Sequence, residues 1–240
     1  MSKEEFFNKM KENEKYFDFH FSVEQLEQFF AYMNLLIEWN EKMNLTAIID
    51  PDEIILKHFI DSITILKEIE NNSKIIDVGT GAGFPGVPLS IMNPTIKMTL
   101  ADSLNKRLIF LQEVINKLNL KNIEIIHARA EELGQSKRYR ENFDIATSRA
   151  VANLSTLSEY LIPLVKNDGK VISMKAGEAQ EEIETAKKAI KILGGKIDKI
   201  EEFNLPQTEI ERTIIIIKKE RHTPSGYPRK AGIPSKSPIK

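Results

Sequence analysis

The chain of 240 residues contains no cysteine, which excludes disulfide bridges, thiolate metal ligands and cysteine nucleophiles. No apolar run approaches the length of about 20 residues that a membrane-spanning helix needs. The polar start Met1–Glu5 lacks the pattern of a signal peptide. The four histidines are scattered along the chain, without the spacing of a metal site. These absences predict a cytoplasmic protein with no metal and no membrane contact, and a monomer is the default expectation.

Basic residues gather near the end of the chain, although the formal net charge of the whole is only −1. The segment from Lys218 to Lys240 carries a net charge of +6 and four of the ten prolines. We expect residues 220–240 to form an extended tail that does not pack, because prolines without apolar periodicity make poor core elements. Charge alone leaves two alternatives open, a solvated end or a segment that contacts a polyanion such as RNA. In the second case Arg229, Lys230 and Lys236 would contact phosphates, and deleting the tail would leave the melting temperature nearly unchanged.

A glycine-rich turn after a short apolar run is the most informative stretch of the sequence. The run Ile75–Val78 predicts a buried strand, and it leads directly into Gly79, Gly81, Gly83 and Gly86. Glycines spaced this closely let the backbone turn sharply and approach a ligand, because no Cβ blocks either. The stretch from residue 84 to 92 can then form a helix. This arrangement is typical of a nucleotide-like cofactor site.

An acidic residue, Asp102, follows the next predicted strand, 23 positions after Gly79. This is close to the spacing of about 20 residues at which a strand-end carboxylate accepts hydrogen bonds from ribose hydroxyls. Residues 81–86 match the dinucleotide fingerprint G-x-G-x-x-G, which leaves a nicotinamide-dependent oxidoreductase as an alternative. Asp77 within the strand extends the pattern to D-x-G-x-G-x-G, which is typical of S-adenosylmethionine-dependent methyltransferases. Asp77 would also hold the glycine turn through hydrogen bonds to backbone N–H groups.

The rest of the chain divides into three parts. Residues 1–72 predict a helical extension packed on the core, with helix starts at Ser22 and Asp50. Residues 73–219 alternate between strands and helices, which predicts an α/β fold with a mostly parallel sheet covered by helices on both faces. The last two strands are separated only by a turn around Pro206, so they should pair antiparallel. Residues 220–240 form the basic tail. Strands are expected near 74–79, 96–101, 123–127, 143–147, 169–175, 196–203 and 211–218, and helices notably over 104–118, 154–165 and 178–193.

Several dispersed motifs together resemble the bacterial 16S ribosomal RNA guanine-N7 methyltransferases, also called the glucose-inhibited division protein B family. The resemblance covers essentially the whole chain. The motifs are Trp39-Asn40, Asn44-Leu45-Thr46, His58–Ser62, Ile76–Gly86, Asp102–Arg107, Arg129-Ala130-Glu131, Arg149–Ala152 and Thr223–Pro234.

The resemblance implies the seven-stranded class I methyltransferase fold, S-adenosylmethionine as cofactor, and the small ribosomal subunit or its 16S rRNA as partner. The methylated base would be guanine 527 in the conventional numbering of that RNA. Within the cofactor site it places Gly79 and Phe84 at the walls, Asp102 at the ribose, and Ala130 with Glu131 at the adenine.

Arg149 follows the fourth predicted strand, where ligands bind in open α/β sheets. From this position it would contact the cofactor, a phosphate or the guanine, and it is the one candidate for a catalytic role. A contact with the cofactor or a phosphate is favoured, because a bond to guanine N7 would block the nucleophile.

The expected chemistry needs no obvious general base. Guanine N7 already carries a lone pair, so catalysis can consist of positioning N7, the methyl group and the sulfur, and of excluding water. Methylation at a pyrimidine C5 position normally requires a cysteine, which the chain lacks. Residues 147–150, Thr-Ser-Arg-Ala, also differ from the Asn/Asp-Pro-Pro-aromatic motif of exocyclic amine methyltransferases. A third alternative is a non-catalytic ribosome assembly factor that keeps a methyltransferase fold.

Overall fold

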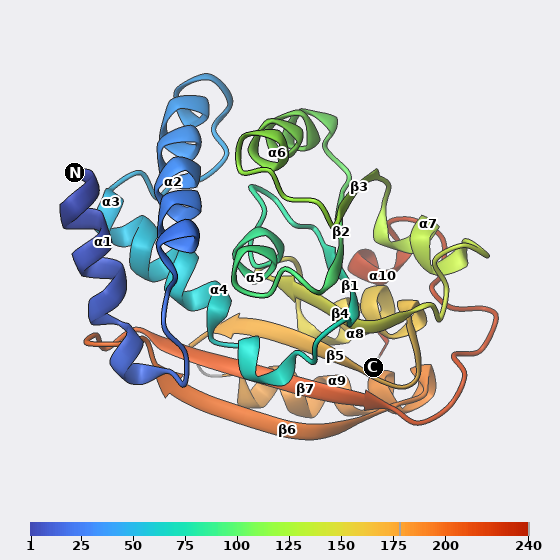
Figure 1. Cartoon of the computed structure of the whole chain (residues 1–240). Coiled ribbons are helices and arrows are strands. Elements are labelled where there is room, and N and C mark those ends of the chain that lie inside the picture. The colour runs from blue at the N-terminus through green and yellow to red at the C-terminus, as the bar shows by residue number, and fades with distance from the viewer. Residues whose placement is uncertain (178, 240) are drawn as a thin grey trace.

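The computed structural model describes residues 1–177 and 179–239, which form one twisted seven-stranded sheet covered by helices on both faces (Figure 1). The strand order is β3-β2-β1-β4-β5-β7-β6. Strands β1 to β5 pair in parallel, whereas β7 is antiparallel to both of its neighbours, β5 and β6. The predicted sheet and its terminal hairpin are therefore confirmed. The strands are β1 Lys74–Val78, β2 Lys97–Asp102, β3 Ile123–His127, β4 Phe143–Arg149, β5 Val165–Ala176, β6 Gly195–Asn204 and β7 Glu211–Lys219.

The helices lie in two layers that the alternation of side chains along the strands keeps apart. In β7, Ile214 and Ile216 join the core beneath the N-terminal helices, α5 and α6, whereas Ile215 and Ile217 join the core beneath α7, α8 and α9. This is the two-residue period of a strand buried on both faces. The helices are α1 Lys3–Glu12, α2 Val23–Met43, α3 Pro51–Glu53, α4 Asp61–Ile63, α5 Gly86–Met92, α6 Asn105–Lys117, α7 Ala130–Gln135, α8 Leu154–Leu161, α9 Gln180–Leu193 and α10 Ile233–Lys236.

Short 3₁₀ turns at 14–16, 66–68 and 162–164 and a π-helical segment at 54–60 complete the secondary structure of the described residues. The first residue of the predicted helix 178–193 lies outside those residues. None of the helices described is long and apolar enough to cross a membrane.

The N-terminal extension packs on the face that carries the glycine turn. Ser22 caps the start of helix α2, and its side chain forms the predicted capping box with Gln25. Its Tyr32 hydroxyl, which is completely buried, donates a hydrogen bond to the carbonyl of Ala82 in the glycine turn. Trp39 contacts Phe110 of α6, with ring centroids 5.8 Å apart. The N-terminal extension therefore packs against the glycine turn and holds it through the bond from Tyr32.

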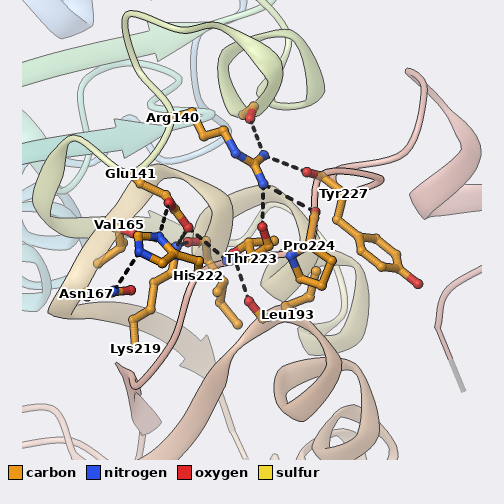
Figure 2. Close-up of polar contacts among 12 residues, drawn as sticks. Arg140, Glu141, Val165, Asn167, Leu193, Lys219, His222, Thr223, Pro224 and Tyr227 are labelled. Atoms are coloured by element: carbon orange, nitrogen blue, oxygen red, sulfur yellow. Dashed lines mark hydrogen bonds and ion pairs between the residues drawn. The ribbon is translucent and has the colours of Figure 1, made fainter.

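The basic tail is packed, so the prediction of an extended segment was wrong. Figure 2 shows the start of the tail held by Arg140, which donates hydrogen bonds to the carbonyls of Thr223, Pro224 and Tyr227. Beside them the Glu141 carboxylate binds His222, the backbone N–H of Thr223 and the buried Lys219. Proline and charge did not prevent packing, because groups of the core satisfy the polar atoms of the tail.

Deleting the tail would remove these contacts. We therefore expect the deletion to lower the melting temperature, contrary to the expectation from the sequence. The side chains of Thr223, Pro228 and Pro234 are buried against the helices of the core. Lys240, counted in the charge of the tail, lies outside the described residues.

Candidate cofactor-binding site

Three glycines after β1 adopt the left-handed conformations that the sequence pattern implied. Gly79, Gly81 and Gly83 have φ angles of 70°, 62° and 100°. The N–H groups of Gly79 and Thr80 both donate to the carbonyl of Ala101 at the end of β2, at 2.8 and 3.1 Å. The turn is therefore fixed to the neighbouring strand, at the carboxyl edge of the sheet where ligands bind in open α/β folds.

Gly81 and Gly83 have opposite surroundings. A Cβ on Gly83 would lie 2.6 Å from the Tyr32 hydroxyl and 2.7 Å from a methyl of Val87. A Cβ on Gly81 would meet only the carbonyl of Gly79, at 4.0 Å. Gly83 is thus required by packing, whereas Gly81 faces open space on the side where a ligand would approach.

Asp77 lies at the base of the turn and is completely buried. Its Oδ2 accepts hydrogen bonds from the Thr80 hydroxyl at 2.7 Å and from the Gly86 N–H at 3.0 Å. These bonds confirm the interpretation that Asp77 holds the glycine turn. Its Oδ1 is buried without a partner among the described residues. Burial raises the pKa of Asp77 to about 6, and the bonds from Thr80 and Gly86 only partly oppose this shift.

Asp102 stands at the end of β2, next to the glycine turn. Its Oδ1 accepts the N–H of Leu104 at 2.8 Å, and its Oδ2 accepts the N–H of Gly81 at 3.0 Å and a guanidinium N–H of Arg107 at 3.1 Å. A carboxylate offers about four lone-pair sites, so these three bonds leave room for a hydroxyl donor. The bond to Gly81 also shows a role that the sequence did not reveal, since Asp102 fixes the turn directly.

Arg149 was expected to face a ligand, but its head group is bound by the N-terminal extension. It donates to the carbonyl of Lys57 at 3.0 Å and to Oδ2 of Asp61 at 3.1 Å, and it contacts Nδ1 of His58 at 3.1 Å. Its guanidinium also lies over the ring of Phe84, 5.1 Å from the centroid. Through these contacts Arg149 connects β4 to the N-terminal extension and to Phe84. A direct catalytic role of Arg149 remains a prediction.

Asp61 binds Arg149 beside the proposed cofactor site, and the sequence did not predict this role. It is almost fully buried and pairs with both Arg149 and Arg212, whose Nε lies 3.0 Å from its Oδ2. Its one sequence signal was the motif His58–Ser62, which the family resemblance included without assigning it a role. The ion pairs join the extension to β4 and β7, which are far apart in the sequence.

His58 packs against Phe84 with ring centroids 4.3 Å apart, and its Nε2 lies 3.0 Å from the Thr46 hydroxyl. Burial, followed by the charge of Arg149, lowers the pKa of His58 to about 3. The folded state therefore binds fewer protons than the unfolded chain between pH 3 and about 6.5, so its stability rises with pH across this window.

We expect His58→Gln to remove this dependence, because glutamine keeps a hydrogen-bonding side chain but does not titrate. The free energy of unfolding should then depend on pH less steeply than in the wild type, by up to about 1.4 kcal/mol per pH unit within the window. Urea unfolding of both proteins from pH 4 to 6.5 measures the two slopes. Equal slopes would show that His58 is not held neutral.

The remaining predicted site residues belong to α7 and to the basic tail. Ala130 and Glu131 form the first turn of α7, and Glu131 is buried, with its carboxylate accepting the N–H of Gly232 at 2.8 Å. Lys230 and Lys236 are exposed. Arg229 is partly buried, and its head group is paired with the completely buried carboxylate of Glu159 on α8. This pairing disfavours a phosphate contact of Arg229, which stays a prediction.

The residues around the turn fit S-adenosylmethionine better than a dinucleotide. The buried Oδ1 of Asp77 has no hydrogen-bond partner in the described parts of the chain, and Gly81 leaves space above the backbone. Two carboxylates, Asp77 and Asp102, flank the turn, which favours a cofactor with sulfonium and ammonium charges and disfavours a diphosphate. Within the described part of the chain, no three His, Asp or Glu side chains cluster as metal ligands. Two hollows of about 310 and 320 Å³ lie away from the turn. The cofactor site is therefore assigned from the hydrogen bonds and the open space around the glycine turn, and not from a cavity.

The family model of rRNA small subunit methyltransferase G matches residues 25–212 of the chain. The protein of that name from Acetivibrio thermocellus is 58% identical over 217 residues, which cover 90% of this chain and 89% of the relative. The one from Oceanobacillus iheyensis is 48% identical over the full length of both chains.

Solved structures resemble the chain at low identity and therefore bear on the fold alone. A putative transferase of Pyrococcus horikoshii has a TM-score of 0.55 at 13% identity, covering 67% of this chain and 63% of its own. A precorrin-6y C5,15-methyltransferase of Geobacter metallireducens has a TM-score of 0.52 at 14% identity, covering 66% and 87%.

Proposed function

The chain belongs to the rRNA small subunit methyltransferase G family, and we propose that it methylates N7 of one guanine of 16S rRNA with S-adenosylmethionine as donor. Methyl transfer to ribosomal RNA agrees with the names of its relatives and with its class I methyltransferase fold. The family and the fold therefore exclude the oxidoreductase alternative. The observation that carries the choice of cofactor is the glycine turn flanked by the carboxylates of Asp77 and Asp102.

When bound, S-adenosylmethionine supplies an electrophilic methyl group on a sulfonium. Asp102 would accept a ribose hydroxyl through its remaining lone pair, while it keeps Gly81 in place. Asp77 holds the turn from below, and its free Oδ1 would receive a donor of the cofactor, directly or through water. The residues thereby orient the donor, and no side chain has to remove a proton because guanine N7 already has a lone pair.

One experiment tests the reaction and the base together. Small ribosomal subunits that lack the modification are incubated with the protein and tritiated S-adenosylmethionine, and the labelled nucleotide is mapped. We expect a single labelled guanine, guanine 527, with the methyl group on N7. Binding of the subunit without transfer of label would favour the alternative of a non-catalytic assembly factor.

Asp102→Ala tests the proposed ribose contact. We expect the affinity for S-adenosylmethionine to fall by roughly 10- to 150-fold, the equivalent of a charged hydrogen bond of about 1.5–3 kcal/mol. Calorimetric titration measures it, and circular dichroism checks that the fold survives. Arg107→Ala is the matched control, because it removes another partner of Asp102 and leaves the carboxylate itself in place. Unchanged affinity in folded Asp102→Ala would contradict the assignment.

Lys230 and Lys236 are the tail residues that we propose as phosphate contacts. Both are exposed, and no ion pair of either is recorded among the described residues. We expect the double substitution Lys230→Gln/Lys236→Gln to make the slope of log affinity for rRNA against log salt shallower by about 1.4–1.8. Filter binding over a range of salt concentrations measures the slope, and Lys11→Gln/Lys15→Gln in the N-terminal helices serves as the control. An unchanged slope would remove the tail from the RNA interface.

A further inference from the structure

The C-terminal segment runs from the end of β7 to the helices that follow the carboxyl ends of β3 and β4. It leaves β7 at Lys219, where the start of the tail is held by Arg140 and Glu141 (Figure 2). It then passes α7, where a Cβ on Gly134 would lie 2.6 Å from Pro228. It ends beside the first turns of α7 and α8, because Glu131 and Thr156 bind its backbone. The segment thus runs along α7 and α8 towards the carboxyl edge of the parallel strands.

A buried ion pair fixes the middle of this path. Both oxygens of Glu159, which is completely buried in α8, accept hydrogen bonds from the Arg229 guanidinium, the shortest at 2.6 Å. Oε1 also accepts the backbone N–H of Arg229 at 2.7 Å. A bidentate pair of this kind restricts both position and direction. It sets the register with which the residues after Arg229 reach the helix starts.

Beyond the pair, the segment bridges two helix starts that border the proposed cofactor site. Gly232 donates its N–H to Glu131 in the first turn of α7. The side chains of Ser155 and Thr156, in the first turn of α8, donate to the carbonyls of Ile239 and Pro234 at 2.6 and 3.1 Å. Helix α7 follows β3, and α8 follows the loop from β4, in which a methyl of Val151 would lie 2.6 Å from a Cβ on Gly79. The three contacts therefore tie together structures on two sides of the glycine turn.

We infer that residues 229–239 act as a strap that positions these helix starts and so raises the affinity for the cofactor, an inference that rests on the proposed function. Arg229, Glu159 and Glu131 are its positioning residues: the ion pair sets the register of the strap, and the Glu131 carboxylate holds it at the adenine side. Docking of the strap and binding of S-adenosylmethionine are then coupled. Because such coupling is reciprocal, the cofactor must also stabilise the docked strap.

A truncated chain ending at Ala231 separates positioning from stability. It keeps the Arg229–Glu159 pair and the whole network of Figure 2, and it loses the contacts to Glu131, Ser155 and Thr156. We expect its dissociation constant and KM for S-adenosylmethionine to rise by about tenfold, within the range of roughly 5- to 150-fold typical of coupled sites. Its kcat should stay near the wild-type value when both the cofactor and the rRNA are saturating, because the loss of Lys236 affects rRNA affinity only. The matched control, Lys230→Gln/Lys236→Gln, keeps the strap and should bind the cofactor normally.

Limited trypsin digestion of the full-length protein tests the same coupling without a mutation that endangers the fold. Cleavage after Lys230 requires the strap to undock, so saturating S-adenosylmethionine should slow it by a factor similar to the loss of affinity on truncation. Equal digestion rates with and without the cofactor, or a truncated chain with wild-type affinity, would overturn the strap. A full-length protein that binds no S-adenosylmethionine would instead contradict the proposed function.

Discussion

Gly81→Val is expected to abolish binding of S-adenosylmethionine while leaving the chain folded. The residue has a φ of 62°, at which a β-branched side chain costs about 1–3 kcal/mol. This is less than the typical stability of a domain, about 5–15 kcal/mol. A Cβ there meets no protein atom nearer than 4.0 Å, so the valine side chain would extend into the space assigned to the ligand. Calorimetric titration should detect no binding, and circular dichroism should show a native spectrum.

Gly83→Ala, two residues further on, serves as the matched control with the opposite outcome. Its Cβ would lie within 2.9 Å of Tyr32, Val87 and Leu111, at a φ of 100°. Overpacking and backbone strain each cost about 1–3 kcal/mol, so this smaller substitution should lower the free energy of unfolding by about 2–6 kcal/mol, while the space assigned to the ligand stays open. If Gly81→Val instead bound the cofactor at wild-type affinity, the glycine turn would not be the cofactor site.

The parts of the fold that the sequence predicted correctly are those set by local patterns. Ile214–Ile217 are apolar on both sides of the strand, which requires a sheet buried on both faces, and that is where they lie. The glycines after β1 marked a turn with positive φ angles, because glycine adopts these conformations with little strain. In both cases the physical cause lies within a few residues.

What the sequence did not reveal are the partners of side chains that bind groups distant in the sequence. Arg229 was assigned to RNA from local charge, yet its partner Glu159 is 70 residues away. Arg149 was expected to face a ligand, yet it binds the carbonyl of Lys57, 92 residues away. A count of charges treats each one as solvated, whereas the fold supplies buried acceptors that no periodicity reveals. Lys230 and Lys236 show the converse, since neighbours of Arg229 in the same basic segment remain exposed.

Arg229→Met is expected to destabilise the protein strongly, because it leaves the carboxylate of Glu159 buried without its partner. Breaking one side of a buried ion pair typically costs about 3–5 kcal/mol. For a chain of this size that corresponds to a melting temperature lower by roughly 6–20 °C. Methionine keeps most of the aliphatic volume of arginine, so the loss reports on the charge. Thermal unfolding followed by circular dichroism measures it, with Lys236→Met as the exposed control in the same segment, for which no significant change is expected.

Substitution of the other partner, Glu159, should reduce the stability of the protein much less, because the two side chains differ in exposure. Glu159→Met leaves Arg229 unpaired, but the arginine side chain is 27% exposed and can reach water, whereas the side chain of Glu159 is 0% exposed. The double variant Arg229→Met/Glu159→Met removes both charges, so it should be clearly more stable than Arg229→Met alone. Additive losses in the double variant would show that the two side chains act independently. In that case the tail would be held by its backbone contacts and the network around Arg140, and the ion pair would not fix its register.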